Sequence, residues 1–219
     1  MVYERILLDV EVQCDFFESG GSFYSPELSP AIARQIRRLF AWSRAGHIPV
    51  VSTVLRVQPN RPGPLGATPH CVEGTRGELR LARTILPRHI DFGLRNVTDL
   101  PRDLFSQYRQ VIFEKRVTDI FAHSRAERMI TELGGGTFVI CGAGLAHGIV
   151  EAAVGLRSRG FGVILASDAV LALPGEKIEM AFRRMEAKGV IFAPTEKIIL
   201  PARTKPAAPF RSANQPVPR

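Results

Sequence analysis

The sequence predicts an α/β protein with a Rossmann-like, three-layer α-β-α sandwich around a mostly parallel sheet of about six strands. Short apolar runs alternate with amphipathic segments along the chain, and glycine or proline separates them. The stretch 138–166 shows the pattern most clearly, with a buried strand, a glycine turn, a helix and a second strand. Strands that alternate with helices favour a parallel sheet covered by helices on both faces.

The first half of the chain supplies two predicted strands and one helix. Apolar runs predict strands over 6–12 and 47–55. Between them, Ser29 and Pro30 resemble an N-cap and a first-turn proline, and apolar residues at helical spacing continue the helix to Gly46. The segments 15–26 and 56–77 are rich in glycine, proline or polar residues, and we expect loops there, the second of which shapes a pocket.

The second half repeats the alternation. Strands are predicted over 110–114, 138–141, 161–166 and 190–193, and helices over 124–133, 149–160 and 176–188. The chain of 219 residues has the length of one such domain, which we place at 1–200. The remainder, 201–219, is basic and rich in proline and alanine. We expect it to be a flexible extension or to pack on a neighbouring subunit.

Composition bounds the compartment and the partners. No apolar stretch has membrane-spanning length and the first residues lack a signal-peptide pattern, so we expect a cytoplasmic protein that does not contact membranes. Three cysteines, an odd number without metal spacing, agree with a reducing compartment. The formal charge is +8, but the basic residues are scattered and no aromatic residues are interleaved with them, which argues against nucleic-acid binding.

Polar residues or glycines lie at the carboxyl ends of three of the predicted strands. They are Glu11, Lys115 and the turn 142–148. In a parallel sheet the carboxyl ends of the strands meet at one edge, which is where ligands bind. We therefore expect these three segments to form one site.

The segment 138–169 resembles the signature of the isochorismatase-like hydrolases, the cysteine hydrolase superfamily that includes nicotinamidases. Gly142, Gly160 with Phe161, and Asp168 with Ala169 fall on that frame. The family's catalytic cysteine falls on Gly148, which is similar to the branch of isochorismatases proper that carries glycine there. By this resemblance Leu145 and His147, just before Gly148, contact substrate. A capping role for His147 is the alternative.

The segment 7–17 resembles the family's opening motif, Asp-x-Gln-Asn-Asp-Phe. Gln13, Asp15 and Phe16 match it, and the catalytic aspartate falls on Glu11. The resemblance implies that Glu11 is catalytic and that Gln13 and Phe16 contact substrate. Asp9 is an alternative carboxylate, because alternate residues of a strand share a face.

The segment 112–121 resembles the second family motif, in which a lysine ends a strand and an aromatic residue follows six positions later. Lys115 and Phe121 match, which implies a catalytic lysine and an aromatic residue at the substrate. A lysine beside a buried carboxylate lowers its pKa and can hold an anion. A salt bridge to Glu11 or Glu114 without a catalytic role is the alternative.

The segment 68–79 is similar to the nicotinamidase string Pro-x-His-Cys-Val-x-Gly-Thr-x-Gly-x-Glu. In that family the histidine, here His70, helps to bind a metal with an Asp-x-His sequence, but Leu55 and Val57 occupy those two positions here. One histidine does not make a metal site, so we expect neither a metal nor another cofactor. His70 is interpreted as a residue that lines the pocket or fixes the loop.

The resemblance implies a hydrolase that works without a nucleophilic cysteine. Glu11 would protonate a small anionic vinyl ether such as isochorismate, Lys115 would hold a substrate carboxylate, and Gly148 would leave room for the substrate. Cys141 is expected in the core, while Cys14 and Cys71 remain minor candidates for a replacement thiol. The alternative is a catalytically silent family member that binds a metabolite or acts as an oligomer scaffold. Family members commonly form oligomers, so we expect a homo-oligomer.

Overall fold

A computed structural model describes residues 3–200, and within them seven strands form one parallel sheet. The strand order is β3-β4-β2-β1-β5-β6-β7. The strands span β1 Arg5–Val10, β2 Val50–Leu55, β3 His89–Asp91, β4 Gln110–Lys115, β5 Thr137–Ala143, β6 Gly162–Leu171 and β7 Ile191–Ala193. The predicted α/β class is confirmed, and the additional strand is β3. It has three residues at the sheet edge, too few to produce a periodic pattern.

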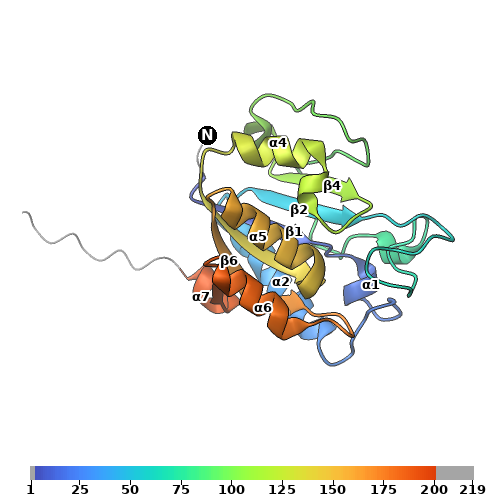
Figure 1. The fold of residues 1–219 in the computed structure, drawn as a ribbon. Coiled ribbons are helices and arrows are strands. Elements are labelled where there is room, and N and C mark those ends of the chain that lie inside the picture. The colour runs from blue at the N-terminus through green and yellow to red at the C-terminus, as the bar shows by residue number, and fades with distance from the viewer. Residues whose placement is uncertain (1–2, 201–219) are drawn as a thin grey trace, which may run out of the picture.

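Helices cover both faces of the sheet, as Figure 1 shows. The helices are α1 Cys14–Phe17, α2 Ser29–Ala45, α3 Leu104–Gln107, α4 Ser124–Glu132, α5 Val150–Ser158, α6 Ile178–Ala187 and α7 Thr195–Ile199. Helices α4, α5 and α6 lie in front of the sheet in this view, and α2 lies behind it. The three predicted layers are therefore present.

Each face of the sheet has its own apolar core. On one face Leu8, Phe113 and Phe138 pack against α4, α5 and α6. On the other face Leu7 and Val50 pack against α2, including its fully buried Phe40. Burial of both faces explains why the strands read as continuous apolar runs rather than as alternating ones.

Strand ends differ from prediction where the backbone leaves the extended conformation. β1 was predicted to reach Val12 but ends at Val10, because Glu11 has a left-handed φ of 48°. β5 continues past its predicted end at Cys141 to Ala143, with Gly142 at a φ of 132°. A β-bulge against β6 accompanies this glycine. These irregularities lie at the carboxyl edge of the central strands, where the predicted site residues gather.

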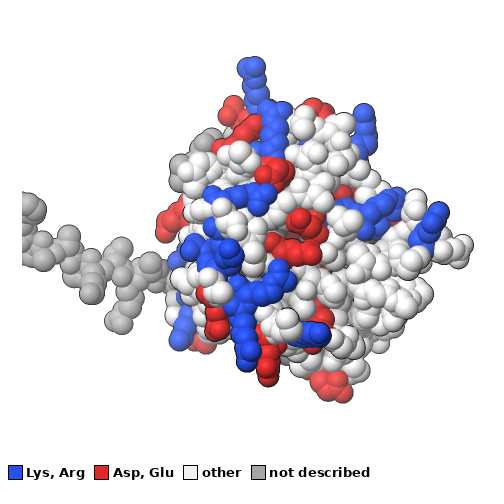
Figure 2. Space-filling view, viewed as in Figure 1, with Lys and Arg blue, Asp and Glu red and all other residues white. Residues whose placement is uncertain are grey.

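The surface of the described residues carries charges of both signs. Figure 2 shows basic and acidic side chains interspersed over the face formed by α4, α5 and α6. Between residues 3 and 200, no helix is long and apolar enough to cross a membrane. The predicted tail, 201–219, lies outside the described residues.

Candidate active site

Glu11 is the buried carboxylate at the centre of the site. It follows β1 directly, and its left-handed backbone turns its side chain toward β4 and the turn after β5. The residue is fully buried. Its Oε1 accepts a hydrogen bond from Lys115 Nζ, and Thr53 Oγ1 lies 3.5 Å from the same oxygen. The predicted encounter of Glu11 and Lys115 is therefore present in the structure.

Lys115 ends β4 and uses all three of its ammonium protons within the protein. Besides Glu11, Nζ donates to the carbonyl oxygens of Val117, at 2.9 Å, and Thr118, at 2.7 Å. Its side chain is 2% exposed. An ammonium has three donors and no acceptor. Lys115 therefore has no free proton for a substrate carboxylate. Its geometry fits a residue that positions Glu11 and stabilises its carboxylate form.

Burial raises the pKa of the Glu11 carboxyl above its ordinary value, and the charge of Lys115 offsets part of this effect. The nearby carboxylate of Glu151 raises the pKa further. Glu11 Oε2 is buried and accepts no hydrogen bond. The site thus contains a carboxyl group with one anchored oxygen and one unsatisfied oxygen, which is the arrangement of a group that can carry a proton.

Gly148 lies against this carboxylate. The chain leaves β5 through Gly144, at a φ of 75°, and forms a π-helical turn over Leu145–Ile149 before α5 begins. An ideal Cβ on Gly148 would lie 2.8 Å from Glu11 Oε2 and 3.2 Å from Oε1. The absence of a side chain at 148 was predicted to leave room for substrate. The structure corrects this, because the carboxylate of Glu11 fills that space.

Leu145 and His147, the two residues of this turn that were predicted to contact substrate, differ in exposure. Leu145 is 3% exposed and belongs to the apolar core, so its predicted contact with substrate stays a prediction. His147 has an irregular backbone, with φ −118° and ψ −113°, and its Nε2 lies 3.7 Å from Glu176 Oε1. Its side chain is 36% exposed, so solutes can reach it.

Asp9, the alternative carboxylate, belongs to a separate buried cluster. It accepts hydrogen bonds from Ser52 Oγ and, at 2.7 Å, from Arg80 Nη2. Burial raises the pKa of Asp9, and Arg80 counteracts that rise. The expectation that Asp9 and Glu11 share a face is wrong, because the left-handed backbone at Glu11 breaks the alternation of the strand. The preference for Glu11 is consistent with its contact with Lys115.

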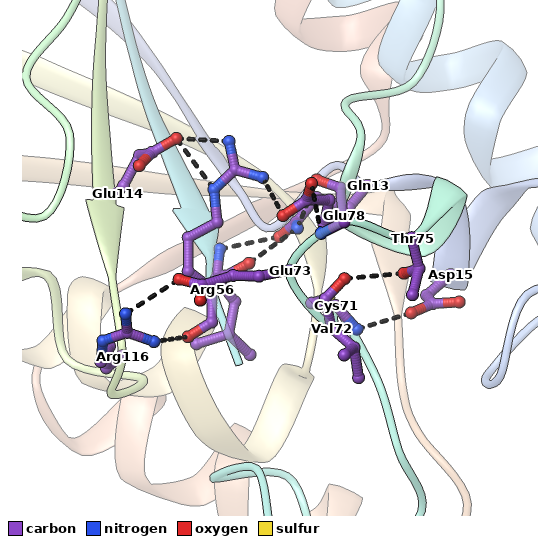
Figure 3. A network of polar contacts seen from close by, with 12 residues as sticks. Gln13, Asp15, Arg56, Cys71, Val72, Glu73, Thr75, Glu78, Glu114 and Arg116 are labelled. Carbon is purple, nitrogen blue, oxygen red and sulfur yellow. Dashed lines mark hydrogen bonds and ion pairs between the residues drawn. The ribbon is translucent and has the colours of Figure 1, made fainter. Parts of the chain in front are cut away.

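Gln13 and Asp15 fasten the loop that follows β2 (Figure 3). Gln13 Oε1 accepts from the Leu55 amide at 2.8 Å, and its Nε2 donates to the carbonyl oxygens of Leu55 and Glu78, both at 2.9 Å. The carboxylate of Asp15 accepts from the Cys71 amide. A substrate contact of Gln13 stays a prediction, since its amide is engaged here with backbone groups.

Arg56 adds a second anchor for the same loop. Its guanidinium lies between Glu114 near the end of β4 and Glu78 at the far end of the loop, as Figure 3 shows. The three side chains are 15–21% exposed. The loop 57–78 is thereby attached to two strand ends rather than left free over the site.

The two aromatic residues predicted at the substrate contribute to packing. Phe16 is fully buried and its ring stacks on Phe23 at 5.9 Å. Phe121 packs against Gly155 of α5, where any side chain would collide with its ring. The guanidinium carbon of Arg159 lies 3.7 Å from the Phe121 ring centroid. Direct substrate contact by Phe16 or Phe121 therefore stays a prediction.

His70 does not belong to a metal-binding group. Its Nδ1 contacts the carbonyl oxygen of Thr68 at 2.6 Å, and its Nε2 is buried without a hydrogen-bond partner. That nitrogen faces the Cα of Gly63, beside the apolar Val57. Within residues 3–200 no three potential ligands gather in a way that could hold a metal ion. The donor set therefore does not fit a divalent cation.

All three cysteines are buried with free thiols. Burial raises the pKa of Cys14 to about 11 and raises those of Cys71 and Cys141 well above the ordinary value. A nucleophilic cysteine needs a lowered pKa. The protein therefore supplies no thiolate near neutral pH from these residues.

Three participants were absent from the predicted site: Thr53, Glu151 and Glu176. Thr53 lies on β2, directly beside β1, and pairs in register with Val10. Its hydroxyl therefore lies next to Glu11. Glu151 follows Gly148 by three positions, which could have suggested it, because residues at that spacing share a helix face. Glu176 comes from the loop after β6, and nothing in its local sequence indicates the contact with His147.

Comparison with known proteins identifies the class. The Glu11–Lys115 pair lies at the carboxyl edge of the parallel sheet, and the family model described as Isochorismatase domain matches residues 5–197. The chain belongs to the isochorismatase family. A search of the curated proteins found no match.

Solved structures agree on the fold. A nicotinamidase from Bacillus subtilis is similar with a TM-score of 0.67 and 18% identity, over 87% of this chain and 99% of that one. An isochorismatase family protein from Desulfovibrio vulgaris gives 0.66 and 18%, over 89% and 96%. A pyrazinamidase of Pyrococcus horikoshii in complex with zinc gives 0.64 and 23%, over 88% and 99%. At these identities the likeness concerns the fold alone.

Proposed function

We propose that this protein is a hydrolase that works without a covalent intermediate and uses Glu11 as a general acid on a small anionic vinyl ether such as isochorismate. One observation supports the proposal above the others. Glu11 is a fully buried carboxyl with a raised pKa, and its Oε2 accepts no hydrogen bond. A general acid needs a pKa near the working pH and a proton that it does not already donate to another acceptor in the protein.

The chemistry divides into three steps. Glu11 Oε2 gives its proton to the terminal carbon of the vinyl ether, which becomes an oxocarbenium ion while Glu11 becomes a carboxylate. Water adds to that cation and releases a proton, and the resulting hemiketal breaks down to a ketone and an alcohol. Lys115, already bonded to Oε1, stabilises the carboxylate formed in the first step. Lys115 is thus a positioning residue rather than the ligand of the substrate anion.

The site must open for substrate to enter. Glu11 is fully buried, and Gly148 is buried beside it. Leu65 of the loop after β2 approaches Gly144 from outside, with its Cδ2 at 3.9 Å from an ideal Cβ there. Outward movement of the part of this loop around Leu65, between the anchors at Arg56 and Cys71, would open a path past Gly144 toward the Glu11 carboxyl.

A second candidate function is a catalytically silent family member that binds a metabolite or supports an oligomer. The closed geometry favours it. All three protons of Lys115 are used internally, and Glu11 occupies the space that a side chain at 148 would take. A buried pair of this kind can persist as a structural ion pair.

Turnover separates the two candidates. Purified protein is incubated with isochorismate and with simpler enol ethers, and the ketone product is measured by chromatography. The general-acid proposal expects turnover that Glu11→Gln abolishes, since the amide cannot deliver the proton. Glu132→Gln, an exposed glutamate on α4, is the matched control and should keep full activity.

The pH profile gives an independent readout. Turnover should fall as the pH rises through the raised pKa of Glu11, because the acid form is consumed. Absence of turnover in correctly folded protein, or a rate that Glu11→Gln leaves unchanged, would contradict the proposal. Absence of turnover would favour the second candidate, a catalytically silent family member.

A further inference from the structure

A groove of about 500 Å³ lies at the amino edge of the sheet. Its lining combines the start of β1, the last turn of α2, the segment before β2 and the end of α7, and it includes Arg5, Trp42, Ile48, Ile199 and Leu200. Figure 1 shows α7 and α1 at opposite ends of the molecule, and α1 follows closely on Glu11. The groove is therefore separate from the site of Glu11.

The elements around the groove are bonded to one another. Trp42 and Ile199 are partly buried and pack against the same apolar core. Arg5 Nη1 donates to the carbonyl oxygen of Ile198 at 2.9 Å, and the Arg5 guanidinium carbon lies 5.9 Å from the centroid of the Trp42 ring. These contacts hold the end of α7 beside Trp42. They give the groove an aromatic and apolar lining with a fixed position in the fold.

The described part of the chain ends at this groove. Leu200 lines it and is 57% exposed, and residues 201–219 follow directly. The tail is therefore attached at the groove itself. A segment that covers Leu200 removes apolar surface from water, which contributes favourably to docking.

The sequence of the tail contains a segment that suits an aromatic groove. Residues 205–211 read Lys-Pro-Ala-Ala-Pro-Phe-Arg, with Pro206 and Pro209 three positions apart. A polyproline II helix has about three residues per turn, so two prolines at this spacing share one face of such a helix. Grooves lined by aromatic residues recognise segments of this kind. Residues 201–205 leave enough chain to reverse direction, since connections between packed elements commonly have about 2–6 residues.

The charges of the groove and the tail are complementary. Glu4 lines the groove and is exposed, and it forms no ion pair between residues 3 and 200. The tail carries four basic residues and no acidic one, and the basic residues are Arg203, Lys205, Arg211 and Arg219. Lys205 and Arg211 flank the two prolines. An exposed ion pair with Glu4 contributes little affinity, but it orients the segment in the groove.

We propose that residues 205–211 dock in this groove of their own chain, with Pro206 and Pro209 against Trp42. The contacts can be individually weak because the segment is tethered. A closely tethered segment has an effective concentration in the millimolar range, so a dissociation constant of about 0.1 mM for the free peptide keeps it docked roughly nine-tenths of the time. The docked segment covers Leu200 and holds the end of α7 against α2.

Trp42 reports on the groove directly, because it is the single tryptophan of the chain. The full-length protein is compared with a double variant that carries Pro206→Ser and Pro209→Ser. A second double variant, Pro216→Ser with Pro218→Ser, removes two prolines from the far part of the same tail and is the matched control. We expect acrylamide quenching of Trp42 fluorescence to rise about twofold in the first variant, because the undocked groove is open to the quencher, and to stay unchanged in the control. Both pairs lie outside residues 3–200, so neither alters a contact of the described fold.

Limited digestion with trypsin follows the tail instead of the groove. Cleavage after Arg211 requires the undocked segment, and its rate follows the undocked population. Leu200→Ser removes an exposed apolar side chain from the groove and should speed this cleavage about fivefold. Met180→Ser removes a similarly exposed apolar side chain that does not line the groove, and it should leave the rate unchanged.

Three results would overturn the proposal. They are equal quenching of Trp42 in the parent and the two double variants, equal cleavage rates after Arg211 in Leu200→Ser and Met180→Ser, and quenching of the parent that rises on dilution to the level of the first double variant. The last result would assign the groove to the tail of a second copy. None of these measurements concerns Glu11, so the general-acid proposal stands or falls on its own tests.

Discussion

Glu11 and Gly148 share one volume, since the Glu11 Oε2 atom lies 2.8 Å from the point where a side chain on residue 148 would begin. Val10 Cγ1 lies 3.0 Å from the same point. A side chain at residue 148 would therefore force the Glu11 carboxylate to shift. The reach of the Glu11 side chain and the absence of a side chain at Gly148 are therefore physically linked.

Gly148→Ala should destabilise the protein by about 1–3 kcal/mol, because the added methyl group collides with the Glu11 carboxylate. Glu11→Asp shortens the side chain and should recover part of this loss in the double variant. Urea unfolding of the four proteins measures the coupling. Gly46→Ala is a control with a negative φ of −87° and a flexible Ile48 side chain nearby. Purely additive losses would show that the two residues do not share the space.

Arg80→Met should cause a large loss of stability, about 3–5 kcal/mol, because it leaves Asp9 charged and buried. The Arg80 side chain is 5% exposed and Asp9 is fully buried. Arg76→Met removes the partner of Glu18 at an exposed pair and should barely move the urea midpoint. Similar effects of the two substitutions would contradict the assignment of Asp9 to a structural cluster.

Glu176 should make stability depend on pH. Burial raises its folded pKa above the unfolded value, so the folded chain retains this proton to higher pH. The resulting stabilisation is complete below about pH 4 and is lost as the pH rises through the folded pKa. The free energy of unfolding of the parent, relative to Glu176→Gln, should thus fall between pH 4 and that pKa. An opposite slope would refute the direction of this shift.

The three thiols should resist modification in the folded protein. Cys14, Cys71 and Cys141 are buried, and their raised pKa values keep them protonated. Ellman's reagent at pH 8 should therefore react only after urea is added. Rapid reaction of one thiol in the native protein would revive the possibility of a cysteine nucleophile.

Metal removal should change nothing. Dialysis against EDTA is expected to leave the melting temperature unaltered, because Leu55 and Val57 cannot coordinate a cation and His70 faces Gly63. Elemental analysis of the purified protein should find no stoichiometric divalent metal. A fall of several degrees after dialysis would show that ligands outside this loop were overlooked.

The layered fold could be predicted because its signals are local. Buried strands such as Val50–Leu55 and the amphipathic helix α2 carry their patterns in consecutive residues. The meeting of Glu11 and Lys115 also followed from topology, since Glu11 directly follows β1 and Lys115 ends the parallel strand β4. The strand β3 was missed because a three-residue edge segment has no period.

The fine geometry of the site could not be predicted, because it depends on backbone conformation and on distant partners. The left-handed φ of Glu11 separates it from Asp9, and a glutamate gives no sequence signal for such a conformation. The saturation of Lys115 depends on carbonyl oxygens of the following loop. Backbone acceptors of this kind are invisible in the amino-acid sequence.

Gln13 lets the protein separate two tasks at the end of β1. Its side-chain amide accepts a hydrogen bond from the Leu55 N–H and donates one to the Leu55 carbonyl oxygen. The last residue of β2 thus has both backbone groups bonded, as it would beside a neighbouring strand. The end of β2 therefore keeps its hydrogen bonds after the backbone of β1 has turned away at Glu11. As a result, the attachment of the loop to the end of β2 runs through Gln13 and does not depend on the side chain of residue 11.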